Sequence, residues 1–206
     1  MRRWPDGRRL RRLPDMSVHL NRIYTRTGDD GMSRLGDSSQ VRKTDPRLVA
    51  YADVDEANAA IGTALALGAP PEDVTEVLRT IQNDLFDVGA DLCTPIVPDP
   101  RYPPLRVTQA AVDRLEGWCD DFNARLGKLD SFILPGGTPA AALLHTARTV
   151  TRRAERAVWA LLETDPERCN ILTARYLNRL SDLLFILARV CNPDGDVLWK
   201  PGSGQA

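Results

Sequence analysis

The sequence has little of what most local catalytic and metal-binding motifs are made of. Of 206 residues, 2 are histidine, 6% are aromatic and 4 are cysteine. No cysteine pair has the spacing of zinc ligands or of a redox dithiol, so we expect four free thiols in a reducing cytoplasm. A di-iron carboxylate bundle needs paired Glu-x-x-His motifs. Ala142 stands three residues before His145, which excludes that class.

An excess of one charge and long apolar runs are missing as well. The chain has 27 Lys and Arg against 28 Asp and Glu, a net charge of -1 and a pI near 6.1. This balance argues against nucleic acid or an anionic membrane as the main partner. No apolar run reaches the ~20 residues that a membrane span needs. The phosphate-loop pattern G-x-x-x-x-G-K-[ST] does not occur either.

The first residues differ in composition from the rest. The stretch "MRRWPDGRRLRRLP" is basic and lacks the apolar segment of a secretory signal. We expect residues 1–20 to be a disordered extension, residues 21–192 to form a single domain, and residues 193–206 to be a C-terminal tail.

Five segments have the period and the boundaries of helices. One begins after Asp45 as N-cap, with Pro46 in the first turn, and ends near Gly68. The others run from about 71 to 92, from about 108, from the Thr138–Pro139 pair and from about 171, with apolar residues three and four apart. No segment alternates at period two over a useful length. We therefore expect an all-α protein, an antiparallel five-helix bundle, with residues 22–44 and 95–107 irregular.

The fourth helix carries a row of arginines. In "HTARTVTRRAER" (145–156), Arg148, Arg152 and Arg156 follow one another along one side, with His145 and Glu155 among them, whereas Arg153 lies apart. The expected core stripe is on the other side: Leu143, Ala147, Val150, Ala154, Val158 and Leu161. A charged row is usually a solvated face. Arginines one turn apart repel each other, however, so an anion or an acidic partner is the alternative.

Two loops are further candidates for anion binding. In "YTRTGDDGMSRLGD" (24–37), glycines permit positive φ, and backbone N–H groups with the hydroxyls of Thr25, Thr27 and Ser33 are able to cradle phosphates. The same composition also describes a flexible loop. In "FILPGGTP" (132–139), two glycines precede a helix N-terminus, and Phe132 stands before them. Phe132 is equally readable as a core residue ahead of a turn.

Together these stretches resemble the PduO-type ATP:cob(I)alamin adenosyltransferases. The matching segments, in the order in which that family has them, are "IYTRTGDDG" (23–31), "RKTDPRLVAYADVDEAN" (42–58), "NDLFDVGADL" (83–92), "FILPGGTPAAALLHTARTVTRRAER" (132–156) and "YLNRLSDLLFILAR" (176–189). The resemblance covers nearly all of residues 22–192. It departs from the family at Asp30, where lysine is frequent, and at Ala90, where histidine is frequent.

The resemblance implies a five-helix bundle that forms a homotrimer with ATP at each subunit interface. By position, Asp55 and Arg148 match a pair that bridges subunits, and Phe132 matches the aromatic residue beneath the corrin ring. The nucleotide-binding residues that it implies are, from the N-terminal part, Thr25, Arg26, Thr27, Gly28, Ser33, Arg34 and Lys43, and, from the helical face, Arg152, Arg153, Glu155, Arg156 and Asn178.

The reaction that the resemblance implies is a substitution at C5′ of ATP. Cobalt(I) of cobalamin attacks, adenosylcobalamin forms and triphosphate leaves, with Mg²⁺ as the expected counter-ion. A reductase would supply electrons, and a B12-dependent mutase such as methylmalonyl-CoA mutase would receive the product. A non-enzymatic trimer that senses nucleotide or carries cobalamin is the alternative.

Overall fold

The computed structural model describes residues 24–100 and 103–202. The expected disordered extension, residues 1–20, lies outside this range. The chain divides into two compact units, Met1–Asp30 and Gly31–Ala206. In the described part of the first unit, the hydroxyl oxygens of Thr25 and Thr27 are 2.8 Å apart. There the Arg26 guanidinium lies 5.8 Å from the centre of the Tyr24 ring.

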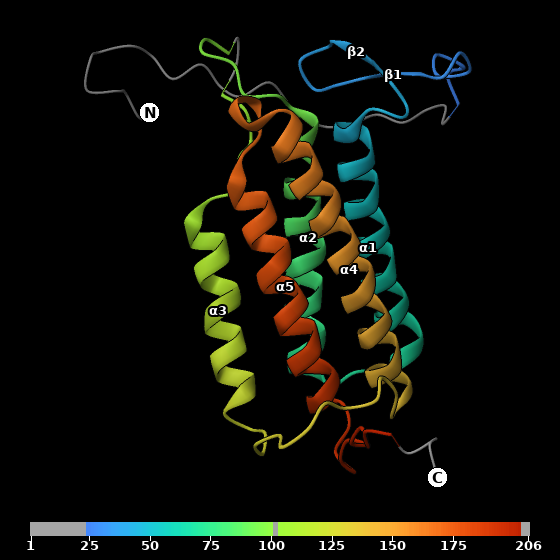
Figure 1. The fold of residues 1–206 in the computed structure, drawn as a ribbon, viewed down its shortest axis with the longest axis vertical. Coiled ribbons are helices and arrows are strands. Elements are labelled where there is room, and N and C mark those ends of the chain that lie inside the picture. The colour runs from blue at the N-terminus through green and yellow to red at the C-terminus, as the bar shows by residue number, and fades with distance from the viewer. Residues whose placement is uncertain (1–23, 101–102, 203–206) are drawn as a thin grey trace, which may run out of the picture. The chain divides into compact units, whose positions relative to one another are not determined.

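The second unit is an antiparallel helical bundle, as the apolar periods predict. Its helices alternate in direction along the chain (Figure 1). Helix α1 packs against α2 and α4, α4 packs against α5, and α5 also contacts α3. The bounds are α1 (Pro46–Gly68), α2 (Glu72–Cys93), α3 (Gln109–Asn123), α4 (Pro139–Thr164) and α5 (Ile171–Val190), with a short 3₁₀ turn, η1 (Pro166–Arg168), before α5.

The helices begin where their capping residues stand. Asp45 Oδ1 accepts a hydrogen bond of 2.8 Å from the Arg47 N–H at the start of α1. Thr138 Oγ1 accepts one of 3.2 Å from Ala141 N–H at the start of α4. Asn170 Oδ1 accepts one of 3.1 Å from Leu172 N–H at the start of α5. These bonds satisfy backbone donors that a helix leaves unpaired in its first turn. The boundaries predicted at Asp45 and Thr138 are confirmed.

The expectation that residues 22–44 are irregular is wrong for a short hairpin. Strands β1 (Met32–Arg34) and β2 (Gln40–Arg42) pair antiparallel, with Ser33 opposite Val41. Strands of three residues are too short for a period of two to be visible. The hairpin leads into α1 (Figure 1), and its Gly36 N–H donates a bond of 2.9 Å to the Cys93 carbonyl. A Cβ at Gly36 would lie 2.2 Å from Thr94 Oγ1, so this approach requires glycine.

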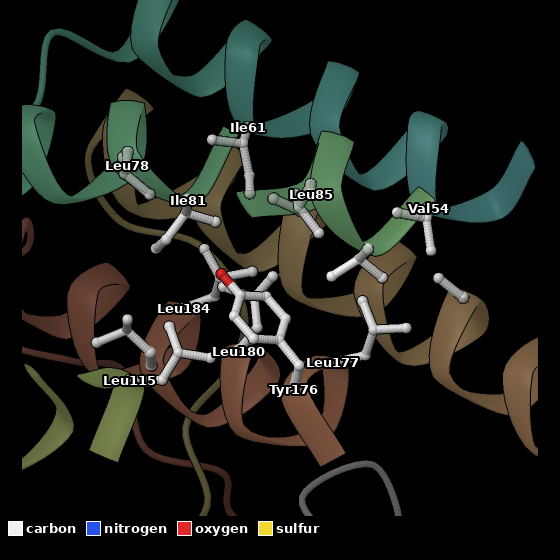
Figure 2. Close-up of a cluster of buried hydrophobic side chains, with 14 of the residues drawn as sticks. Val54, Ile61, Leu78, Ile81, Leu85, Leu115, Tyr176, Leu177, Leu180 and Leu184 are labelled. Atoms are coloured by element: carbon white, nitrogen blue, oxygen red, sulfur yellow. The ribbon is translucent and has the colours of Figure 1, made fainter. Parts of the chain in front are cut away.

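The core lies between α2, α5 and the inner sides of the other helices. Figure 2 shows Leu78, Ile81 and Leu85 of α2 facing the α5 side chains, with Ile61 of α1 behind them. Tyr176 of α5 is fully buried there. Its phenolic O–H donates a bond of 2.9 Å to Asp84 Oδ2. A buried phenol needs such a partner, so this pair allows the core to contain the ring.

The core stripe predicted for α4 is too narrow. Leu143 and Val150 are only half-buried, whereas Leu144, His145 and Thr151 are buried. The reason is that α4 packs against both α1 and α5. A helix with two neighbours buries a wider arc than the single stripe of a helix with one.

Two buried ionic groups fasten the end of the bundle at which α1 begins. The Arg47 side chain is 3% exposed and donates to Leu92 O at 2.8 Å, to Asp165 Oδ2 at 2.8 Å and to Arg168 O at 3.0 Å. Asp91 is 1% exposed and accepts bonds from Arg106, from Val107 N–H and from Asn170. Buried charges are tolerated when they are satisfied in this way. Together they connect α1, α2, η1 and the start of α5.

Candidate functional site: an arginine row beside a polar groove

The predicted arginine row lies on the outer side of α4. Arg152 and Arg156 are exposed, and Arg148 is half-buried. Burial and then the positive charge of Arg152 lower the pKa of Arg148. The smaller of the two effects, repulsion by Arg152, is the one that a bound anion would relieve.

Glu155 and Asn178, both implied as nucleotide residues, are brought together. Asn178 Nδ2 of α5 donates a bond of 3.0 Å to Glu155 Oε1 of α4. The pair lines a groove of about 390 Å³ between α3, α4 and α5. Trp159, one turn after Glu155 and 42% exposed, lines the same groove with Arg175. Trp159 is not among the residues predicted for the site, although its position four residues after Glu155 places both side chains on the same face of α4.

Arg153 points elsewhere. It forms an ion pair with Glu56 of α1, and the hydrogen bond to Glu56 raises the pKa of Arg153. Arg153 therefore has an acidic partner within the chain, on the α1 side of α4. The arginines of the row, Arg148, Arg152 and Arg156, have no ion-pair partner among residues 24–100 and 103–202.

Ser33 and Lys43 share a second hollow. Both line a pocket of about 460 Å³ that the hairpin forms with the first turns of α1, where Tyr51 and Asp53 also lie. Burial raises the pKa of Tyr51, and a hydrogen bond from the side chain of Ser33 opposes this effect. Arg34, at the end of β1, is exposed. This pocket and the α3–α4–α5 groove share no lining residue.

The remaining N-terminal candidates belong to the first unit. Thr25, Arg26 and Thr27 are exposed and Gly28 is half-buried in the turn that ends at Asp30. Arg26 has a positive φ of 62°, which is uncommon for a residue with a side chain. The roles implied for these four residues stay predictions.

Phe132 is not a core residue. It is 78% exposed and lies edge-on to Trp199, with the ring centres 6.1 Å apart. Trp199 N–H donates to Phe132 O at 2.7 Å, and Leu134 N–H donates to Val197 O at 2.8 Å. A segment of the expected C-terminal tail is thus hydrogen-bonded to the loop before α4. The reading of Phe132 as a core residue is wrong, and an aromatic surface faces outward at this end of the bundle.

Asp55 and Arg148 do not form a pair within the chain. Asp55 is exposed on α1, and no ion pair among the described residues contains either side chain. The Nε atom of Arg148 is buried and has no hydrogen-bond acceptor in the described part of the chain. An acidic partner for Arg148 would have to come from outside the described residues.

His145, which the helix projection places among the arginines of the row, is buried. It is 3% exposed, and its ring lies edge-on to Phe185 of α5 at 6.0 Å. Burial and then Arg148 lower the pKa of His145, and Asp196 opposes this shift. His145 is therefore a neutral imidazole at pH 7.

The described residues contain no group of three or more His, Cys, Asp or Glu side chains arranged to hold a metal ion. Their four cysteines are free thiols. None of the helices in the described part of the chain is both long enough and apolar enough to cross a membrane.

Comparison with known proteins shows which family this sequence resembles. A sequence model of that family, described as "Cobalamin adenosyltransferase", matches residues 23–191. A corrinoid adenosyltransferase of Mycobacterium tuberculosis is 69% identical over 190 residues, which cover 92% of this chain and 98% of that protein. A corrinoid adenosyltransferase of Bacillus subtilis is 45% identical over 174 residues, 83% of this chain and 86% of that protein.

Solved structures agree with the sequence comparison. A variant of the PduO-type ATP:corrinoid adenosyltransferase from Lactobacillus reuteri, complexed with cobalamin and ATP, superposes with a TM-score of 0.80 at 36% identity. The match covers 87% of this chain and 97% of that chain. Another variant of that enzyme, complexed with ATP, has a TM-score of 0.77. The chain belongs to the cobalamin adenosyltransferase family.

Proposed function

We propose that this protein is a corrinoid adenosyltransferase. It transfers the 5′-deoxyadenosyl group of ATP to the cobalt of cob(I)alamin, which yields adenosylcobalamin and releases triphosphate. The observation that carries this proposal is the row of arginines on α4, without an ion-pair partner among residues 24–100 and 103–202, beside the groove of Glu155 and Asn178. The relative from Mycobacterium tuberculosis is named a corrinoid adenosyltransferase, and the structure from Lactobacillus reuteri contains both cobalamin and ATP.

In the proposed reaction the protein supplies no nucleophile. Cobalt(I) attacks C5′ of ATP, the cobalt–carbon bond forms as the C5′–O bond breaks, and the electron pair of that bond leaves on triphosphate. The chain must therefore compensate charge that builds on the leaving group. Exposed arginines on a rigid helix do this well, because their planar forks hold phosphate oxygens bidentately and need no rearrangement. We assign this role to Arg152, with Arg156 beside it.

The remaining candidates have positioning and binding roles in the proposal. Glu155 and Asn178 hold the nucleoside, and Ser33, Arg34 and Lys43 of the hairpin region hold the phosphates. Phosphate contacts of Thr25, Arg26, Thr27 and Gly28, which belong to the first unit, stay predictions. Arg153 is the least supported member of this set, because Glu56 already neutralises it. Phe132 lies beneath the corrin ring, where an exposed aromatic face excludes water from the cobalt. A four-coordinate cobalt(II) accepts an electron more readily.

We further propose that the working unit is a homotrimer with ATP between subunits. The two groups of nucleotide candidates support this, because the hairpin pocket and the α3–α4–α5 groove have no lining residue in common. Residues from the hairpin of one copy would complete the groove of the next. The absence of a partner for Asp55 and Arg148 among the described residues fits a contact between copies.

The described residues contain no group of three carboxylate, histidine or thiol side chains that could coordinate Mg²⁺. Mg²⁺ commonly binds through few protein ligands and several phosphate oxygens. We therefore propose it only as a counter-ion that arrives on the triphosphate, and no step above depends on it. A cytoplasmic location, an electron-supplying reductase and delivery to a mutase such as methylmalonyl-CoA mutase stay predictions.

A single-turnover experiment tests the function. Purified protein is mixed anaerobically with ATP and chemically reduced cob(I)alamin, and the solution is analysed for triphosphate and for the absorption of a cobalt–carbon bond. Formation of both products at equal amounts supports the proposal. Tight binding of ATP and cobalamin without either product would instead identify a carrier and overturn the transferase assignment.

A further inference from the structure

Buried polar atoms without a partner point to a contact on α4. In the described part of the chain, three buried side-chain atoms have no hydrogen-bond partner: Asn58 Oδ1, His145 Nδ1 and Arg148 Nε. Native proteins pair nearly all buried polar groups, so each exception needs a physical reason. Two of the three atoms belong to one helix and are three residues apart.

These two atoms are complementary. Arg148 Nε always carries a proton and only donates, whereas an unprotonated imidazole nitrogen accepts. Residues three apart are neighbours on a helix surface. Side chains on a helix also lean toward its N-terminus, which directs Arg148 toward His145. A donor without an acceptor and an acceptor without a donor are therefore adjacent.

The third atom does not compete for this contact. Asn58 is on α1, and its amide Nδ2 donates a bond of 3.0 Å to the Gln82 carbonyl of α2. Gln82 Nε2 in turn donates to the Asn58 carbonyl. Asn58 thus faces α2.

The surroundings of the two side chains indicate that Arg148, and not His145, changes its conformation to form the contact. His145 is 3% exposed, and Phe185 packs against the ring, so the imidazole is fixed. Burial and then Arg148 lower its pKa, which favours the neutral imidazole. A neutral imidazole has one ring nitrogen that accepts a hydrogen bond. Arg148 is half-buried and has rotatable bonds between Cβ and the guanidinium. Of the two side chains, Arg148 is therefore the one that is able to change conformation and bring its Nε–H toward Nδ1.

We propose that His145 is a positioning residue for Arg148: in the working protein, Nε–H of Arg148 donates to Nδ1 of His145. The bond fixes the plane of the guanidinium and leaves both Nη groups free for an acidic partner. The bond also accounts for a buried histidine within a row of arginines. The bond itself rests on the two unpaired atoms, and only its effect on turnover rests on the proposed function.

A matched pair of variants separates the two ring nitrogens. His145→Asn places an amide oxygen where Nδ1 stood, whereas His145→Gln extends its polar atoms to the position of Nε2 and leaves none at Nδ1. We expect His145→Asn to keep kcat/KM near wild type. We expect His145→Gln to lower it about tenfold, the value of a lost hydrogen bond to a charged group. Equal losses in both variants would overturn the proposal.

A double-mutant cycle links the effect to Arg148. Arg148→Lys keeps the charge but has no Nε–H, so His145→Gln should cause no further loss of kcat/KM in that background. A second tenfold loss on top of Arg148→Lys would show that His145 acts independently, which contradicts the proposal.

A spectroscopic readout detects the bond without turnover. In protein labelled with ¹⁵N-arginine, we expect the Arg148 Nε–H proton to give a resolved signal that exchanges slowly with water. The signal should persist in His145→Asn and disappear in His145→Gln. A wild-type signal that exchanges like that of a free arginine would overturn the inference. A protected signal in a protein without transferase turnover would retain the inference and refute the proposed function.

Discussion

Asn178 of α5 donates a 3.0 Å hydrogen bond to Glu155 of α4, and both side chains line the groove beside the arginine row. This contact holds two helices in register at the place where we propose that the nucleoside binds. The Arg152 guanidinium, three residues before Glu155, is exposed and has no ion-pair partner among the described residues.

Arg152→Lys should lower kcat by about 100-fold, because a point charge replaces a fork that holds the leaving triphosphate bidentately. The fold should be unaffected, since Arg152 is exposed. Single-turnover kinetics with saturating ATP measure the change. Arg79→Lys, an exposed arginine of α2, is the matched control and should turn over normally. Near-normal turnover of Arg152→Lys would refute the assignment.

Phe132→Ala should abolish the spectroscopic signal of four-coordinate cobalt(II) with little loss of stability. Surface substitutions usually change the free energy of unfolding by about 0.5 kcal/mol or less, and Phe132 is 78% exposed. Electron paramagnetic resonance of bound cob(II)alamin and urea unfolding measure the two effects. Phe86→Ala, at 71% exposure on α2, controls for the loss of an exposed ring. A large destabilisation with an intact cobalt signal contradicts the prediction.

Exchanging the charges of Asp55 and Arg148 should restore assembly that either single reversal weakens. Asp55→Arg and Arg148→Asp each place like charges at the proposed subunit contact, and the double variant restores attraction. Sedimentation velocity measures the trimer fraction. If the double variant assembles no better than the single ones, the two side chains do not meet.

Stability should fall as the pH drops below about 6.5, because burial and Arg148 depress the pKa of His145 in the folded state while Asp196 opposes them only in part. The unfolded chain then binds more protons than the folded one, so acid favours unfolding by up to about 1.4 kcal/mol for each unit of pKa difference. Urea unfolding at pH 7.5 and 5.5 measures this. His145→Asn should flatten the dependence, and an unchanged slope would assign the effect to another group.

Asp91→Ala should destabilise the fold by about 3–5 kcal/mol, because it leaves the partly buried Arg106 without its carboxylate partner. It also removes the acceptor of Val107 N–H and of the Asn170 amide. Urea unfolding gives the free energy, and Asp121→Ala on the exposed side of α3 is the control. A loss below about 1 kcal/mol would show that water replaces the carboxylate.

Local chemistry made the helices predictable. Asp45 with Pro46, and Thr138 with Pro139, mark the first turns of α1 and α4, and the structure has these helices at Pro46 and Pro139. The hairpin was not predictable in this way, because its strands have only three residues each and depend on a glycine approach to the end of α2. His145 is buried although it stands among the arginines of α4, because this helix has neighbours on two sides.

The candidate site was less accessible to residue patterns. The arginine spacing indicates an anion, but nothing in it joins Glu155 to Asn178, which is 23 residues away and on another helix. The family resemblance is what implies that both residues bind the nucleotide. Contacts between copies, such as the one proposed for Asp55 and Arg148, leave no periodic signal in a single sequence.

The Arg47 side chain ties α1 to other parts of the chain at the end of the bundle where α1 begins. Local unfolding at that end requires the simultaneous rupture of its bonds to α2, Asp165 and η1. We therefore expect native-state hydrogen exchange to be slowest there and faster around the loop before α4. We propose that the corrin ring binds at Phe132, which stands before α4 at the opposite end of the bundle, so that its entry would not require the bonds of Arg47 to open.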